Sequence, residues 1–106
     1  MASKSKTYQV YVAPAADRKL AAHMEFLAHV SETAAVRLYA AYEDTLDFLA
    51  ESPQSCPIYA PKTPIDAELR SKMLGKRYRI VFEIVGNSVY VYDIQDCRQD
   101  MDKNLI

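Results

Sequence analysis

Two glycines determine how the second half of this chain can be arranged. Gly75 and Gly86 are the only glycines in the 106 residues, and each stands between runs rich in β-branched and aromatic residues. The pairs Gly-Lys and Gly-Asn at these places are typical of the two-residue turns that join β-hairpin strands. The sequence therefore predicts a three-stranded antiparallel meander, with strands over 68–74, 77–85 and 88–95.

The chain begins with a predicted strand and a helix. Residues 8–12 (Tyr-Gln-Val-Tyr-Val) are typical of a strand. Pro14 suits the first position of a helix, because proline lacks the N–H that would be unsatisfied there. Leucine and methionine then recur at helical spacing up to Leu27, so a helix is expected over 14–30.

A second helix is expected over 31–52. Ser31 can cap its start, and Ser52-Pro53 ends it, because the residue before proline disfavours the α region. Its apolar face follows from Ala35, Leu38, Tyr42, Leu46 and Leu49. Since almost no linker separates the two helices, they should form an antiparallel hairpin.

Residues 53–67 hold four of the five prolines and predict a stiff extended loop within one domain. The piece beyond this loop is too short to fold alone. We therefore expect a single α+β domain over residues 1–106. It comprises an N-terminal strand, an antiparallel helical hairpin and a three-stranded antiparallel meander, with the helices packed on one face of the sheet.

Composition excludes several classes of protein. The net charge is -1, and no apolar run approaches the ~18 residues that a membrane span needs. Lys4 and Lys6 are followed by no apolar stretch, so no signal peptide is expected. We therefore expect a cytoplasmic domain. Cys56 and Cys97 stand in no metal-binding spacing, so we expect free thiols, no metal site and no cofactor.

The predicted hairpins gather basic residues on one face of the sheet. With two-residue turns, Lys72 would face Arg79, and Arg70 would face Val81. The solvent face would then collect Arg70, Lys72, Arg77, Arg79, Glu83, Tyr90 and Tyr92. The core face would collect Leu69, Met73, Tyr78, Ile80, Phe82, Ile84, Val89 and Val91.

This basic face has two interpretations. Like charges on neighbouring strands repel, so the arrangement is a poor choice for stability alone. Arginine presents a planar fork that suits phosphate, and tyrosine offers a surface on which bases stack. The alternative is a solvated strand face whose charges discourage edge-to-edge aggregation.

Three local motifs give the chain a family resemblance. They are the helix ending Leu49-Ala-Glu-Ser-Pro53, the strand Tyr78-Arg79-Ile80-Val81-Phe82, and the last strand Asp93-Ile-Gln-Asp-Cys-Arg98. Their order and spacing resemble the RelE/ParE family of toxins from type II toxin–antitoxin systems. The resemblance covers about residues 8–100.

The resemblance implies functions for individual residues. RelE-branch toxins cleave mRNA on the ribosome, and the matching catalytic residues would be Arg70, Lys72, Arg79 and Arg98. Attack of a ribose 2′-OH on the neighbouring phosphate would be oriented by the first two and stabilised by the last two. Further RNA contacts are expected from Lys76, Arg77, Tyr90 and Tyr92.

Three functions stay open at this point. The first is a metal-independent, ribosome-dependent endoribonuclease that arrests translation; the RelE branch often has a Tyr or His near its end, which Cys97-Arg98-Gln99-Asp100 lacks. The second is a ParE-type inhibitor of DNA gyrase without nuclease activity. The third is a degenerate member that only binds its cognate antitoxin, the partner that all three would share. No reading involves a membrane.

Overall fold

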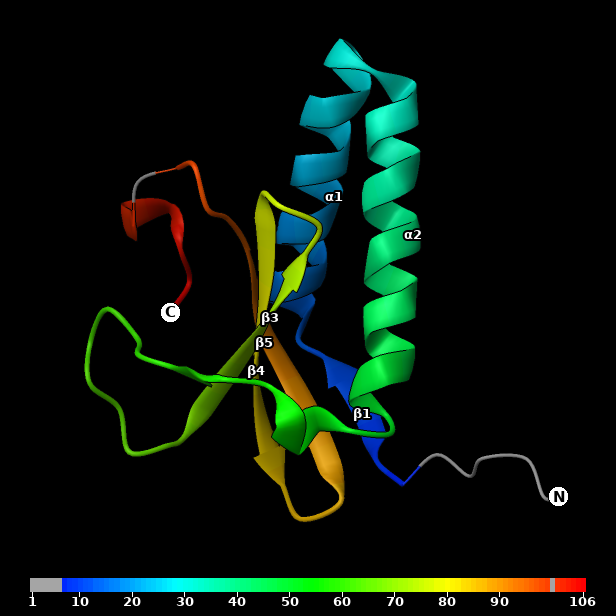
Figure 1. Cartoon of the computed structure of the whole chain (residues 1–106). Helices are drawn as coiled ribbons and strands as arrows, with labels where there is room; N and C mark the ends of the chain where they lie inside the picture. The colour runs from blue at the N-terminus through cyan, green and yellow to red at the C-terminus, as the bar shows by residue number, and fades with distance from the viewer. Residues whose placement is uncertain (1–6, 100) are drawn as a thin grey trace, which may run out of the picture.

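The computed structural model describes residues 7–99 and 101–106 as an α+β domain of two layers (Figure 1). The helices are α1 (Pro14–Val30) and α2 (Glu32–Leu49). The strands are β1 (Gln9–Val12), β2 (Ile58–Tyr59), β3 (Leu69–Leu74), β4 (Tyr78–Val85) and β5 (Ser88–Asp96), with 3-10 turns η1 (Pro53–Ser55) and η2 (Met101–Lys103). The predicted fold class is confirmed.

The sheet has the strand order β1-β5-β4-β3-β2. The N-terminal strand β1 runs parallel to β5, which is the most distant strand in the sequence. A parallel pair needs a long crossover, and the helical hairpin supplies it. β2 adds a short fifth strand within the predicted proline-rich loop, where a loop without a strand was expected.

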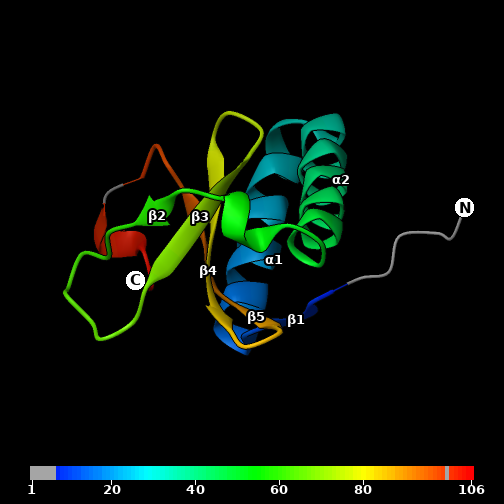
Figure 2. The same cartoon turned by 60° about the horizontal axis from the view of Figure 1, so that its bottom comes forward.

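The helical hairpin packs on one face of the sheet (Figure 2). Its turn is a single residue, Ser31, whose hydroxyl accepts a hydrogen bond from the Ala34 N–H at 3.2 Å and caps α2. The main core lies between the two layers and includes Leu20, Leu27, Leu38, Leu49, Ile80, Phe82, Val91 and Ile94. Neither helix in the described ranges is long and apolar enough to cross a membrane.

The register of β3 against β4 differs from the prediction. The turn contains three residues, Gly75 to Arg77, and Leu74 lies opposite Tyr78. A shift of one residue moves every side chain of a strand to the other face. Lys72 therefore pairs with Ile80 and Arg70 with Phe82, so the predicted pairing of Lys72 with Arg79 is wrong.

The physical reason for this register lies at the turn. Gly75, the first loop residue, has a φ of +66°, a left-handed conformation that glycine adopts without strain. The extra loop residue turns Leu74 into the main core opposite Tyr78, in place of the exposed Met73. Arg77, the last residue of the loop, hydrogen-bonds Asp96. The longer turn is thus accompanied by a buried leucine and a charge-assisted pair.

The hairpin of β4 and β5 is confirmed near its turn and wrong beyond it. Glu83 lies opposite Tyr90, as two-residue turn geometry predicts. A bulge between Val81 and Phe82 then shifts the register, so Val81 lies opposite Asp93 and not Tyr92. Bulges of this kind bend a strand and redirect its side chains.

The face of the sheet opposite the helices is partly covered. A second, smaller core buries Tyr59, Leu69 and Val81 there, and Tyr92 and Ile106 pack against it. The C-terminal segment, residues 103–106, lies on this side of the sheet, opposite the face that the helices cover (Figure 2). The expectation of an entirely solvent-exposed face, with Leu69 and Met73 on the other side, is wrong because of the register shift.

The turn conformation leads to a first prediction. Gly75→Ala should lower the free energy of unfolding by about 1 kcal/mol, because an L-residue with positive φ is strained. A Cβ at Gly75 would meet no atom within 4 Å, so the cost comes from the backbone alone. Lys76→Ala, on the exposed neighbouring residue, is the matched control and should change stability little. Equal stability of both variants in denaturant unfolding would contradict the assigned turn.

Candidate functional site

The structure separates the predicted site residues instead of gathering them. Arg70 and Lys72 lie on the helix side of β3, because they pair with core residues of β4. Arg79, Tyr90 and Tyr92 lie on the opposite face. The exposed residues Lys76 and Arg98 and the turn residue Arg77 lie outside both groups. The predicted single face that holds Arg70, Lys72, Arg77 and Arg79 does not exist.

Arg70 hydrogen-bonds the loop that follows α2. Its Nη1 donates hydrogen bonds to the carbonyl oxygens of Cys56 at 2.6 Å and Gln54 at 3.3 Å. Its Nη2 lies 3.2 Å from Glu68 Oε1. A guanidinium that satisfies backbone carbonyls holds a loop in place, and these donors are already used.

Lys72 borders a small hollow next to the end of α2. Its Nζ lies 4.7 Å from the centroid of the Phe48 ring, a cation–π contact. The hollow of about 310 Å³ is lined by Phe48, Ser55, Cys56, Pro57, Ser71, Lys72 and Met73. Burial raises the pKa of the Cys56 thiol, so this cysteine is a poor nucleophile.

Arg77 forms a bidentate pair with Asp96 at the top of β5. Its Nε and Nη2 donate to the Asp96 carboxylate at 3.1 and 2.8 Å, and its guanidinium carbon lies 5.5 Å from the Phe26 ring centroid of α1. Burial opposes ionisation of Asp96, but the hydrogen bonds from Arg77 and from the Arg98 N–H hold the Asp96 pKa below its ordinary value. Arg77 therefore stabilises the hairpin end.

Arg79 belongs to a polar network on the face away from the helices. Its Nε and Nη2 donate to Gln95 Oε1 at 3.0 and 2.8 Å, and its guanidinium carbon lies 5.1 Å from the Tyr59 ring centroid. Gln95 Nε2 donates to Tyr59 Oη at 2.9 Å and to Asp93 Oδ2 at 3.0 Å. We call these residues, together with Lys19, the Arg79–Asp93 network.

The network is buried although its members are polar or charged. Asp93 and Gln95 are both 0% exposed. A buried carboxylate needs a counter-charge, and Lys19 of α1 provides it, with Nζ 3.0 Å from Asp93 Oδ1. Sequence reasoning missed Lys19, Tyr59, Asp93 and Gln95. The available signal was the alternation Asp93-Ile94-Gln95 in a strand otherwise rich in valine and tyrosine.

Tyrosines continue the same face toward β1. The rings of Tyr11 and Tyr90 stack with centroids 5.3 Å apart and an interplanar angle of 18°. Tyr92 donates a hydrogen bond to Glu83 Oε1 at 2.7 Å, and this bond raises the pKa of Tyr92 to about 12. Tyr11, like Tyr59, is an aromatic residue of this face that the sequence did not suggest.

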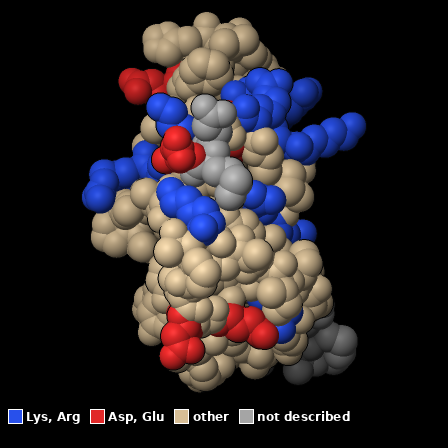
Figure 3. Space-filling view, turned by 90° about the vertical axis from the view of Figure 1, so that its left-hand side faces the viewer, with Lys and Arg blue, Asp and Glu red and all other residues tan. Residues whose placement is uncertain are grey.

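The surface charge of this side is uneven. Figure 3 shows Lys and Arg side chains over much of the upper half of the side that carries the C-terminal segment, with some acidic side chains among them, and further acidic side chains grouped near the bottom. Local charge segregation exists, although the whole chain has a net charge of -1. Such a field favours acidic partners of any kind.

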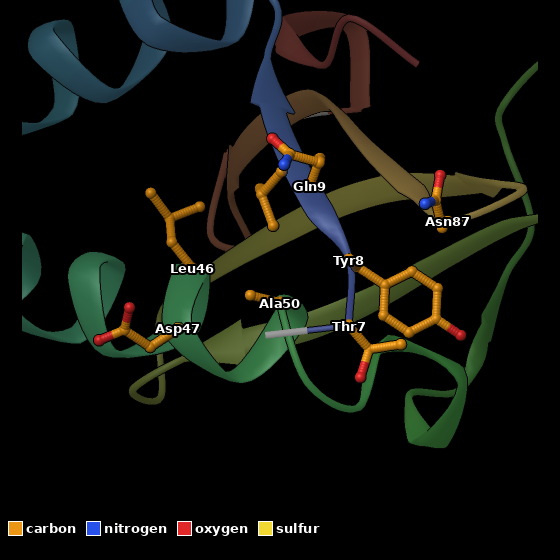
Figure 4. Close-up of a pocket in the computed structure, with 8 residues that line it drawn as sticks. Thr7, Tyr8, Gln9, Leu46, Asp47, Ala50 and Asn87 are labelled. Carbon is orange, nitrogen blue, oxygen red and sulfur yellow. The ribbon is translucent and has the colours of Figure 1, made fainter. Parts of the chain in front are cut away.

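A separate hollow lies at the end of the helical hairpin. It has a volume of about 480 Å³ and is lined by Thr7, Tyr8, Gln9, Val10, Leu46, Asp47, Ala50 and Asn87. Figure 4 shows that it lies between the start of β1 and the end of α2. None of the eight predicted site residues lines it. Among the described residues, no three His, Cys, Asp or Glu side chains are placed to hold a metal ion.

Comparisons with known proteins agree with this fold. The family model described as "ParE toxin of type II toxin-antitoxin system, parDE" matches residues 10–101. A search of curated proteins finds no match. Two of the similar solved structures are a chain of the chromosomal ParDE toxin–antitoxin system from P. aeruginosa and a chain of the archaeal RelE–RelB complex from Pyrococcus horikoshii.

The structural similarity extends over most of each chain. The ParDE chain aligns with a TM-score of 0.65 and 12% identity, covering 87% of this chain and 98% of its own. The RelE–RelB chain aligns with a TM-score of 0.58 and 15% identity, covering 89% and 99%. Identities this low support the fold alone.

The fold, together with the family match, defines a toxin of a type II toxin–antitoxin system. The chain belongs to the ParE toxin family, whose model spans nearly all of it. The predicted membership of the RelE/ParE family is thereby confirmed, and so is an antitoxin as the partner class.

The network changes what is expected of Arg79. The sequence predicts Arg79 on the solvent face, where removing a side chain changes the free energy of unfolding by no more than about 0.5 kcal/mol. In the structure, Arg79→Ala would leave the buried Gln95 Oε1 without both of its donors, so it should lower the free energy of unfolding by about 1–3 kcal/mol.

The control for Arg79 is a second arginine. Arg98→Ala removes an exposed guanidinium near the same end of β5 and should stay within about 0.5 kcal/mol of the parent. Denaturant unfolding of both variants measures the difference. If the Arg79 variant is as stable as the Arg98 variant, the bonds to Gln95 are not formed in solution.

Tyr92 should lose its proton at a higher pH than an ordinary tyrosine. In ultraviolet titration, the difference between the parent and Tyr92→Phe should show a step near pH 12, and Glu83→Gln should move that step to lower pH. Because the folded pKa lies above the ordinary value of 10, the stabilisation is complete below pH 10 and is lost as the pH rises through about 12. A Tyr92 step at pH 10 in the parent would show that the bond to Glu83 is absent.

Proposed function

We propose that this toxin acts by binding a protein target, DNA gyrase, and does not cleave RNA. The observation that supports this proposal is the separation of Arg70 and Lys72 from Arg79 by the thickness of the sheet. Family membership supplies the gyrase-inhibiting branch as the matching activity. Both the chain and its target would then be cytoplasmic.

Ribonuclease chemistry makes geometric demands that this arrangement does not meet. A general base must reach the 2′-OH, and charge stabilisers must reach the same phosphate, each within about 3 Å of the atom it serves. Side chains on opposite faces of a sheet cannot converge on one phosphate. The donors of Arg70, Arg77 and Arg79 are moreover engaged within the chain.

A ribosome-dependent endoribonuclease is the second candidate. The observation in its favour is the basic surface on the side that carries Arg79 and the C-terminal segment (Figure 3). In this reading Arg79 and Arg98 would contact the phosphate, and Lys76, Arg77, Tyr90 and Tyr92 would contact the rest of the RNA. Arg79 would have to leave Gln95 to do so.

For the antitoxin, we propose a groove beside the helical hairpin. A hollow of about 260 Å³ lies between the hairpin and the β3–β4 turn. Leu27, Leu38 and Leu74 contribute apolar lining, and the cations Arg37, Lys76 and Arg77 also line it. An amphipathic antitoxin segment with acidic residues next to its apolar face fits this combination.

Expression of the toxin without its antitoxin separates the two candidate targets. We expect growth arrest with DNA-damage signalling and filamentous cells, while mRNA stays intact. Lys72→Ala should arrest growth as strongly as the parent at equal folded amounts, because Lys72 lies away from Arg79. Cleavage of ribosome-bound mRNA that is lost in Arg98→Ala would overturn the proposal and favour the endoribonuclease.

A further inference from the structure

The strand β1 has a neighbouring strand on one side only. It stands first in the order β1-β5-β4-β3-β2, so it pairs with β5 and forms one edge of the sheet (Figure 2). The N–H groups of Gln9 and Ala13 donate, at 2.9 Å each, to β5 and the residue before it. Because the backbone groups of successive strand residues point to opposite sides, Val10 and Val12 direct their N–H and C=O groups outward, away from β5.

These outward groups have no partner among the described residues. Just before β1, the Tyr8 N–H donates to Ala50 O at the end of α2, at 2.9 Å, and this contact closes the edge at that point. Further along the edge, no described residue bonds to the N–H or C=O of Val10 or Val12. An open stretch of edge backbone is a template for a further strand.

The two edges of the sheet differ in how they are protected. The far edge is β2, which has only two residues and directly follows Pro57. Short edge strands, prolines and charged side chains discourage edge-to-edge pairing. The strand β1, with the sequence Gln-Val-Tyr-Val, contains no proline and no charged residue, and its register with β5 is continuous. Its outer edge is therefore free to pair.

A second copy of β1 fits the open edge in one register. An antiparallel pair around a twofold axis at Tyr11 places Val10 opposite Val12 of the second copy, and Val12 opposite its Val10. The outward groups then face one another, and each of these pairs exchanges both of its N–H···O bonds. An axis at Val10 would need the Tyr8 N–H, which is already bound. An axis at Val12 would need an N–H from Pro14, which has none.

The side chains of β1 suit contact with their own copies. Directly opposite residues of an antiparallel pair point to the same face. Val10 and Val12 are half-buried and pack on the main core, so the valines of the second copy would extend that core into the hollow of about 480 Å³ that Val10 and Leu46 line (Figure 4). On the other face, Tyr11 is 49% exposed and stacks on Tyr90. Its own copy would lie directly opposite, in a pair without hydrogen bonds, where side chains come closest.

We propose that the toxin forms a homodimer by antiparallel pairing of β1 with β1 of a second copy, which joins the two sheets into one. A twofold axis brings each residue near it close to its own copy, so charged residues there would repel. The strand β1 carries no charge, and this favours a second copy over a charged partner segment. The inference goes beyond the proposed function, because it concerns the free chain and depends on neither gyrase nor the antitoxin.

Sedimentation of the full chain over a range of concentrations measures the association. The parent should pass from monomer to dimer as its concentration rises. Val12→Pro removes an outward N–H without removing a bond to β5, and proline is tolerated at such edge positions. Val12→Thr keeps this N–H and is the matched control. The proline variant should dimerise about thirtyfold more weakly than the threonine variant, because each copy loses one hydrogen-bond donor.

A second pair of variants makes the test independent of proline. Tyr11→Lys places two positive charges opposite one another at the axis and removes the aromatic contact, so it should weaken dimerisation about tenfold. Tyr39→Lys changes a tyrosine of α2 that is 43% exposed, and it should dimerise as the parent does. A parent that stays monomeric at all concentrations, or equal dimerisation within either matched pair, would overturn the proposal.

Amide hydrogen exchange locates the contact within the parent chain. At low concentration the Val10 and Val12 amides should exchange fast and the Tyr11 amide slowly, because only Tyr11 bonds to β5. At concentrations where the dimer forms, the Val10 and Val12 amides should become protected too. A dimer in which these amides still exchange fast would overturn the proposal. Protection that appears only when an antitoxin is added to a monomeric chain would assign the edge to the antitoxin, and would overturn it as well.

Discussion

The ion pair between Lys19 and Asp93 connects two residues that lie 74 positions apart in the sequence. Asp93 is fully buried, and a buried carboxylate without a partner would cost several kcal/mol. Lys19 approaches it from α1, and the N–H groups of the C-terminal segment approach it from the opposite end of the chain. One carboxylate therefore fixes a helix, the strand β5 and the segment that covers the sheet. The arrangement of the other residues on the sheet face away from the helices depends on this contact.

The arginines illustrate how the same residue type serves fold and function. Four arginines suggested phosphate chemistry from the sequence, but Arg70 binds carbonyls, Arg77 binds Asp96, and Arg79 binds Gln95. Each of these sites uses the guanidinium as a rigid set of donors. A planar fork that suits phosphate suits carboxylate equally well, and its N–H groups can also satisfy carbonyl oxygens. An arginine in a strand motif thus identifies the family without identifying the chemistry.

The sequence was sufficient for the helices and the fold class but insufficient for the register. Helical periodicity and the Ser31 cap predicted α1 and α2 with nearly correct bounds, because both signals are local. The turn at Gly75 is local too, but two-residue and three-residue loops can both begin with this glycine. Which one forms depends on whether Leu74 or Met73 enters the core and on whether Arg77 reaches Asp96. These are contacts between strands, and neighbouring residues do not encode them.

The wrong register between β3 and β4 also made the predicted site wrong. A shift of one residue places Arg70 and Lys72, half of the proposed catalytic set, on the helix side of the sheet. The Arg79–Asp93 network could not be anticipated, because Lys19, Tyr59 and Gln95 come from three elements with no common motif. Asp93 and Gln95 were visible as polar residues in a buried strand, and such residues need partners. Asking where those partners come from leads to the C-terminal segment.

The C-terminal segment that covers this face limits how other proteins can bind there. A sheet face that holds a buried charge and a buried amide cannot be left dry and empty, because the cost of unsatisfied groups would exceed that of ordering a few residues. The chain supplies its own occupant, and its side chains leave the backbone to make most of the contact. An incoming protein that displaced the segment would have to satisfy Asp93 and Gln95 with polar groups of its own. The largely apolar hollow beside the helical hairpin makes no such demand, so the two sides of the molecule require different partner surfaces.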